Sequence, residues 1–341
     1  MRVLARLTTG ERVTLILILA EIMAAPAAGA DAASSALDPG PRFKVESDLV
    51  RIPVVVIDKE GHLYTDLKKE QFKILEDGVE QPVTVFTGGE APMNIVLLLE
   101  YSSRILPLLG EVVYRAGLFI SQILNPEDYA ALISFDIKPK VVSDFTGHRG
   151  KLFNSLRGLA KDPPSYRESS LYDALEFALA GDMDYAGLSG VQGRTAVLLI
   201  STGRDSLSKI NFDEARKVVA NAGVPVYSIG IGEASALQPY PYMSDISRLN
   251  HYQSRNTLRT FSESSGGRSY TVRFQADIDE VLNSIAAMIR FQYTLGYTPL
   301  NDRQNGKKRK IKVLVDIDGD GKPDNKRLEL QHRRFYVEPK A

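Results

Sequence analysis

Apolar residues follow a period of two in the first part of the chain. Alternation of this kind predicts strands with one buried face. The alternating positions of the first such strand are Val50, Ile52, Val54 and Val56. Val55 and Ile57 are apolar too, so the other face of this strand is expected to be partly covered. Further strands are expected at 72–78, which ends in a turn-forming Asp-Gly pair, and at 81–86. These segments predict a small, sandwich-like β unit.

The middle of the chain has continuous apolar runs that alternate with amphipathic stretches. Such runs are typical of parallel strands buried on both faces. Buried strands are expected at 94–100, 195–200 and 224–232, with shorter strands at 129–135, 141–145 and 269–272. Helices are expected at 105–124, 149–159, 171–179, 213–222, 257–264 and 277–290. Strands that alternate with helices predict a doubly wound, mostly parallel sheet.

The C-terminal part returns to alternation, which predicts strands at 292–298, 310–317 and 327–337. We expect these strands to rejoin the N-terminal β unit. The predicted fold class is therefore α/β, with a doubly wound sheet and a smaller β domain formed by N- and C-terminal segments. The expected boundaries are 43–90 for the N-terminal β unit, 91–290 for the α/β domain and 291–341 for the C-terminal β segment.

The N-terminus has the order of a secretory signal peptide. Arginines precede the apolar run 13–20, and small residues fill 24–30. We expect cleavage near Ala30, a flexible lead-in over 31–42, and a periplasmic or secreted mature protein without an integral membrane span. The alternative is an uncleaved anchor, but the run is short for a bilayer and Glu21 interrupts it.

Composition narrows the possible functions. The 42 Lys+Arg balance 42 Asp+Glu, so no bulk positive field favours nucleic acid. The chain has no cysteine, which excludes disulfides, thiol nucleophiles and cysteine-bound zinc. Phosphate-binding loops, dinucleotide fingerprints and serine-hydrolase elbows are also absent from the sequence. We therefore predict a protein that is not an enzyme. The oligomeric state is not specified by the sequence.

Polar residues follow the expected strands at the edge where open α/β sheets bind ligands. The candidate ligand-binding residues are Glu100, Ser102, Arg104, Ser169 and Thr202.

Several segments resemble the bacterial proteins related to von Willebrand factor type A domains, in which a β segment precedes that domain and a β tail follows it. The likeness covers about 43–315 and is carried by 72–78, 170–175, 225–232, 265–270, 292–299 and 309–313. The resemblance implies a Rossmann-like sheet and a metal-ion-dependent adhesion site. That site uses Asp-x-Ser-x-Ser on one loop, Thr on a second and Asp on a third, and magnesium binds such oxygen ligands.

The chain departs from this pattern at several positions. Glu100 occupies the position of the first Asp, and Arg104 that of the second Ser. Ser169 occupies the position of the Thr, and Thr202 that of the final Asp. Arginine cannot ligate a cation. We therefore expect a degenerate site without magnesium. Arg104 could bind a partner's carboxylate in place of the metal, or it could pair with Glu100 or Glu168 and hold the loop together.

A second candidate ion site lies near the C-terminus. Its acidic residues alternate with glycines, as in calcium loops of the EF-hand type: Asp316, Asp318, Asp320 and Asp324. Arg327 stands where such loops have Glu, so we expect a calcium-stabilised hairpin loop and not an EF-hand. The alternative is an acidic turn without an ion. The basic run Lys307–Lys310 could be a polyanion patch or a solvated edge strand whose lysines block pairing.

The leading hypothesis is an extracytoplasmic module that binds another protein or a cell-surface polymer through its loops. One alternative is a metal-dependent hydrolase that uses Glu100, Asp205 or the acidic loop. Another is a calcium-stabilised structural scaffold. A loop is expected over 233–255, and its tyrosines around 240–243 could form a contact surface or pack within the loop.

Overall fold

The structure is a computed structural model of the whole chain, which divides into the units Met1–Glu46 and Ser47–Ala341. It describes residues 49–88, 91–181, 187–188, 191, 193–232, 244–272, 277–300 and 305–338. The expected signal peptide and lead-in lie outside these residues, and so do 240–243. None of the described helices combines the length and the apolar character that a membrane span requires.

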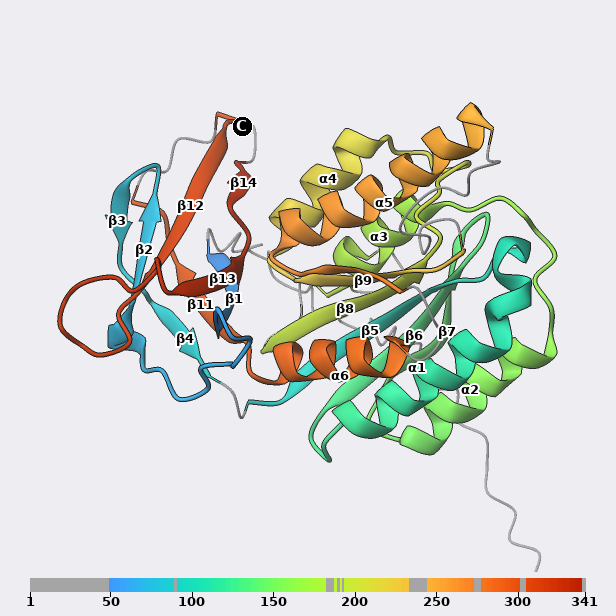
Figure 1. The fold of residues 1–341 in the computed structure, drawn as a ribbon, viewed down its shortest axis with the longest axis horizontal. Helices are drawn as coiled ribbons and strands as arrows, with labels where there is room; N and C mark the ends of the chain where they lie inside the picture. The colour runs from blue at the N-terminus through green and yellow to red at the C-terminus, as the bar shows by residue number, and fades with distance from the viewer. Residues whose placement is uncertain are drawn as a thin grey trace, which may run out of the picture. The chain divides into compact units, whose positions relative to one another are not determined.

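A mostly parallel sheet forms the centre of the α/β domain (Figure 1). Its described strands, in spatial order, are β10 (Ser269–Thr271), β9 (Val226–Gly230), β8 (Arg194–Ser201), β5 (Met93–Glu100), β6 (Tyr129–Phe135) and β7 (Pro139–Thr146). Every neighbouring pair is parallel except β6 and β7, which are antiparallel. β8 is buried along its whole length, as the continuous apolar run predicts.

Helices cover both faces of this sheet (Figure 1). One face packs against α1 (Leu109–Ile123), α2 (Arg149–Lys161) and α6 (Asp277–Arg290). The other packs against α3 (Leu171–Ala180), α4 (Phe212–Asn221) and α5 (Asp245–Ser265). Alternate residues of β5 serve the two cores: Leu97 belongs to the first and Leu98 to the second. The doubly wound α/β fold is therefore confirmed.

Two antiparallel sheets form the β domain. The first has the order β13 (Leu328–His332), β1 (Val50–Asp58), β11 (Tyr293–Tyr297) and β4 (Val85–Thr87). The second has the order β14 (Phe335–Val337), β12 (Lys308–Val315), β2 (Phe72–Glu76) and β3 (Val79–Gln81), with the 3-10 turn η1 (Lys69–Gln71) before β2. Both sheets contribute to one apolar core. N- and C-terminal segments thus build the β domain together, as predicted.

Strand β1 contributes to both domains. Val54 and Val56 lie in the β-domain core, whereas Val55 and Ile57 pack into the core that contains α1 and α6. The expectation that the second face of this strand is covered is confirmed.

A second connection between the domains runs from β13 and β14 to the end of α4. The buried Arg333 guanidinium donates to the Ala220 carbonyl at 2.9 Å, and the Asn221 side chain exchanges two hydrogen bonds with the Val337 backbone. The Arg333 guanidinium thus satisfies carbonyls that the end of α4 leaves without partners.

Three expected elements differ from the structure. The single strand expected at 81–86 is divided between β3 and β4, with Pro82 at the break. The strand expected at 327–337 is divided between β13 and β14, which lie in different sheets and flank the buried Arg333. The loop expected up to residue 255 is wrong from Asp245 onward, because α5 begins there. Ser244 is the N-cap of this helix, and its hydroxyl accepts a hydrogen bond from the Ser247 N–H.

Candidate functional site

Glu100 is the last residue of β5, and its side chain is only 1% exposed. Its Oε1 accepts a hydrogen bond from Ser102 Oγ at 2.6 Å. Its Oε2 accepts from Ser201 Oγ at 2.8 Å, from the Thr202 N–H at 2.7 Å and from Thr202 Oγ1 at 2.9 Å. We call Glu100, Ser102, Ser201 and Thr202 the Glu100 cluster. Both carboxylate oxygens are therefore satisfied by donors of the protein itself.

The Glu100 cluster does not fit the magnesium ion that the resemblance implies. Magnesium needs oxygen lone pairs in an octahedron, including those of one or two carboxylates. Here each hydroxyl donates its proton to Glu100, and Thr202 offers no second carboxylate. Hydroxyl and amide donors occupy the acceptor sites that a cation would need.

Ser169 and Arg104 lie on neighbouring loops and make different contacts. Ser169 Oγ donates to the Arg204 carbonyl at 2.7 Å, and Arg104 Nε donates to the Arg167 carbonyl at 2.9 Å. The Ser103 N–H donates to the Tyr166 carbonyl at 2.7 Å. These bonds connect three loops, 101–108 with the 3-10 helix η2 (Ser103–Leu108), 162–170 and 202–211, which we call the loop face.

The loop after β8 also packs closely against α5. Gly203 has φ +75°, and a Cβ atom there would lie 2.4 Å from the Ser254 carbonyl oxygen. Only glycine fits both this dihedral angle and this approach. The loop face therefore rests on the helix layer beneath it.

The outer side of the loop face combines apolar and cationic side chains. Its three loops expose the apolar side chains of Leu106, Tyr166 and Leu207. They also present the guanidinium-bearing residues Arg104, Arg167 and Arg204, which are exposed or half-buried. Sequence reasoning missed the exposed apolar residues. It also left Ser201 out of the ligand-binding candidates, although this serine directly follows the strand expected at 195–200.

Asp205, the other carboxylate of the hydrolase alternative, is also engaged. Its Oδ1 accepts from Ser208 Oγ at 2.5 Å and from the Tyr172 N–H at 3.2 Å. Burial raises the pKa of Asp205 above its usual range, although these hydrogen bonds act in the opposite direction. Glu100 thus does not present the open carboxylate that a metal-dependent hydrolase would need, and one oxygen of Asp205 is engaged as well.

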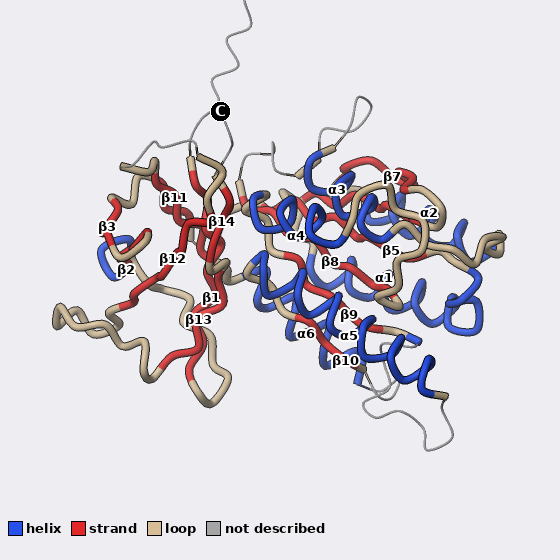
Figure 2. The backbone as a smooth tube through the Cα atoms, turned by 90° about the horizontal axis from the view of Figure 1, so that it is seen from above, coloured by secondary structure: helices blue, strands red, loops and turns tan. Residues whose placement is uncertain are grey.

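The acidic loop, residues 316–324 between β12 and β13, projects away from both sheets (Figure 2). One carboxylate oxygen each of Asp316, Asp318 and Asp324 lies within 4.8 Å of the others. Backbone N–H groups of Gly319 and Gly321 donate to the two oxygens of Asp316 at 2.8 and 2.7 Å. These three carboxylates form the part of the loop that could hold a cation.

The guanidinium of Arg327 contacts two of these three carboxylates. Arg327 pairs with Asp324 and lies 3.5 Å from Asp318 Oδ2. A hydrogen bond from the Ile317 N–H and the Arg327 guanidinium hold the pKa of Asp324 below its usual range. Asp320 is not one of these three carboxylates; its Oδ1 accepts from the Lys322 N–H and its Oδ2 lies 3.8 Å from Lys322 Nζ.

No protein-family model matches the chain, and no curated protein matches it either. Among solved structures, the conserved hypothetical protein BatB from Bacteroides thetaiotaomicron is 17% identical over 57% of this chain and 98% of its own, with a TM-score of 0.42. The vWF domain of the type V pili tip protein Mfa5 from Porphyromonas gingivalis is 13% identical over 58% of this chain and 95% of its own, with a TM-score of 0.44.

Proximal thread matrix protein 1 from the mussel byssus, solved with a zinc-occupied MIDAS motif, is 13% identical. It matches 62% of this chain and 48% of its own, with a TM-score of 0.45. The α/β domain itself has the mostly parallel sheet and the two helix layers described above.

Proposed function

We propose that this chain is an extracytoplasmic binding module whose loop face recognises another protein without a metal ion. The observation that carries the proposal is the Glu100 cluster, in which the protein's own donors occupy both carboxylate oxygens. A surface that binds without a metal must supply affinity from its side chains. The extracytoplasmic location rests on the signal-peptide pattern of residues 1–30.

The side chains of the loop face support this mode of binding. Arginine and aromatic residues are enriched in protein interfaces and supply much of their binding energy. Tyr166, Leu106 and Leu207 offer apolar contact area, and Arg104 and Arg167 offer planar donors suited to a partner's carboxylates. The hydrogen bonds between the loops hold this surface in one arrangement, which lowers the entropic cost of binding.

A photo-crosslinking amino acid placed at Tyr166 tests the proposal. Tyr129 is the matched control, since it is 50% exposed against 49% for Tyr166 and begins β6 at the opposite end of the sheet. We expect a discrete protein adduct in envelope extracts from position 166, with equal yield when a chelator is present. Equal adducts from both positions, or loss of the adduct on chelation, would contradict metal-free recognition by the loop face.

A metal titration provides an independent test. The wild-type α/β domain should gain no thermal stability from magnesium or manganese. The variant Glu100→Asp/Arg104→Ser/Thr202→Asp restores the carboxylates of the adhesion-site pattern and removes its arginine. If these loops align as we propose, a magnesium-dependent rise in Tm should appear in this variant alone.

We further propose that the acidic loop binds calcium and stabilises the β domain. The convergence of oxygens from Asp316, Asp318 and Asp324 favours this role over that of a simple turn. Arg327 would have to move from Asp324 and Asp318 when the ion binds. This role is structural and separate from the loop face.

A further inference from the structure

A cavity of about 880 Å³ lies where the β domain meets the C-terminal half of α5. One wall is formed by β12 and the β2–β3 turn, and another by Thr260, Glu263 and Ser264 of α5. Its volume falls within the range of ~300–1,000 Å³ that ligand pockets occupy. None of the residues of the loop face or of the acidic loop lines it.

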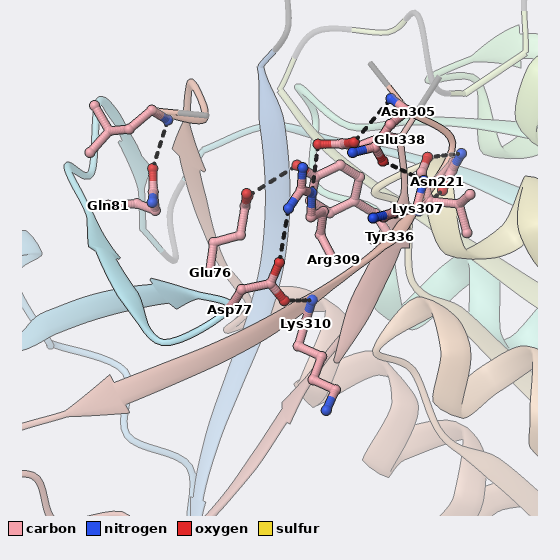
Figure 3. Close-up of polar contacts among 12 residues, drawn as sticks. Glu76, Asp77, Gln81, Asn221, Asn305, Lys307, Arg309, Lys310, Tyr336 and Glu338 are labelled. Atoms are coloured by element: carbon pink, nitrogen blue, oxygen red, sulfur yellow. Dashed lines mark hydrogen bonds and ion pairs between the residues drawn. The ribbon is translucent and has the colours of Figure 1, made fainter. Parts of the chain in front are cut away.

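Three lysines of one strand enter this cavity. Lys308, Lys310 and Lys312 alternate along β12, so they share one face of the strand. Arg309 lies between them and points to the opposite side, where its Nε donates to Glu338 Oε1 at 2.6 Å and its Nη1 lies 3.2 Å from Asp77 Oδ2. Figure 3 shows the Lys310 side chain extending away from this ion-paired group.

More cationic than anionic side chains line the cavity. Lys308, Lys310, Lys312 and Arg334 line it, against the two carboxylates of Asp77 and Glu263. Asp77 is already engaged, by Arg309 and by the Lys310 N–H at 2.9 Å. Within the described part of the chain, none of these four cations forms an ion pair, and the Lys308 ammonium lies 3.7 Å above the Phe335 ring centre. His332 adds no charge at neutral pH, because burial lowers its pKa.

We propose that this cavity binds an extended acidic peptide segment of a partner protein. Side chains on one face of a strand repeat every ~7 Å, so the three lysines leave β12 at that spacing. An extended peptide with Asp or Glu at every second position presents carboxylates at the same spacing. Each carboxylate can then face one lysine, while Arg334, whose carbonyl accepts from the Ile311 N–H, adds a guanidinium with two parallel donors.

The remaining lining favours a peptide over a phosphate polymer. Leu75 and Phe335 give the cavity apolar surface that can contact aliphatic parts of a peptide chain. The carboxylate of Glu263 is exposed on the α5 wall and would repel an uninterrupted row of phosphates. The interior position of β12, paired with both β2 and β14, also excludes the solvated-edge interpretation of its lysines. This site is independent of the proposed loop-face function.

Fluorescence anisotropy with the full chain tests the site. The probe is a labelled peptide that alternates Glu and Ser, and its Gln–Ser counterpart is the control ligand. The variant Lys308→Gln/Lys310→Gln/Lys312→Gln should bind the acidic peptide about tenfold or more weakly. The control variant Lys59→Gln/Lys69→Gln/Lys326→Gln removes the same charge at exposed sites outside the cavity and should bind as the wild type does.

The outcomes separate the possibilities. Binding that weakens with added salt, with an unchanged Tm in both variants, would support the site. No binding of the acidic peptide at up to about 1 mM would overturn it. An equal loss in the control variant would mean non-specific attraction and would overturn it as well. Tighter lysine-dependent binding of heparin or polyphosphate than of the peptide would assign the cavity to a polyanion and reject the peptide.

Discussion

The Glu100 cluster and the acidic loop both bring oxygen atoms close together, but the carboxylate oxygens of the two regions accept hydrogen bonds from different kinds of donor. In the cluster, one buried carboxylate accepts from neutral hydroxyl and amide donors that are fixed in the sheet and its loops. In the acidic loop, Asp318 and Asp324 share an exposed arginine side chain, whereas Asp316 accepts from the backbone N–H groups of Gly319 and Gly321. The comparison indicates that availability to a cation depends on how easily the existing donors can leave.

Removing the buried carboxylate should have the largest effect. Glu100→Ala leaves the Thr202 N–H and the Ser201 hydroxyl without an acceptor and opens a small cavity, so we expect a loss of about 4 kcal/mol in unfolding free energy. Urea unfolding measures the loss. Glu168→Ala, an exposed glutamate on the loop face, should change stability by less than about 0.5 kcal/mol. A loss below about 1 kcal/mol for Glu100→Ala would mean that the donors find other partners and that the cluster is not closed.

Two glycines with similar φ angles compare the packing of the loop face with that of the acidic loop. Gly203 has φ +75° and Gly321 has φ +84°, but only the Gly203 Cβ position meets backbone atoms. Gly203→Ala should therefore destabilise by about 2–3 kcal/mol, from both strain and overlap with α5. Gly321→Ala should cost about 1 kcal/mol, from strain alone. Equal losses in thermal unfolding would show that the loop face is no more tightly packed than the acidic loop.

The sequence predicts the fold where burial is continuous. The runs at 94–100 and 195–200 predict β5 and β8 because a strand buried on both faces has no polar positions. Prediction from the sequence fails where polar residues are buried. The first half of α5 has no apolar period, since its inner face carries His251 and Ser254, and the buried Arg333 separates β13 from β14 in a segment that reads as one strand.

The same distinction holds for the candidate sites, where the sequence predicts which residues lie close together but not which contacts they make. Topology alone places Glu100, Ser102 and Thr202 near one another, because parallel strands end at the same edge of the sheet. The direction of their hydrogen bonds depends on side-chain geometry that no spacing encodes. The lysine cavity depends on β12 and α5 lining the same space, although these elements are separated by more than forty residues in the chain. The sequence therefore shows the basic run but not the wall that faces it.

Freeing the acidic loop from its arginine should increase its affinity for calcium. Arg327→Gln removes the positive charge that now pairs with Asp324 and Asp318, so we expect about tenfold tighter binding, or about 1.4 kcal/mol. Isothermal titration of the chelated full chain measures the affinity. Asp324→Asn should abolish binding, whereas Asp320→Asn should leave it nearly unchanged, because Asp320 lies outside the carboxylate group. Unchanged affinity in Arg327→Gln would mean that the arginine does not compete with the ion.

The smallest expected effect is the pH dependence of the acidic loop. The pKa of Asp324 is lowered in the folded chain by the Ile317 N–H and by Arg327, so the folded pKa lies below the unfolded value of about 3.9. The contacts of Asp324 therefore stabilise the fold above about pH 4, and this stabilisation is lost as the pH falls through the folded pKa. Urea midpoints without calcium should separate the wild type from Asp324→Asn near pH 6 and converge toward pH 3. A gap at pH 3 as wide as at pH 6 would show that Asp324 acts through packing and not through its charge, and would remove the electrostatic reason for expecting a cation at the acidic loop.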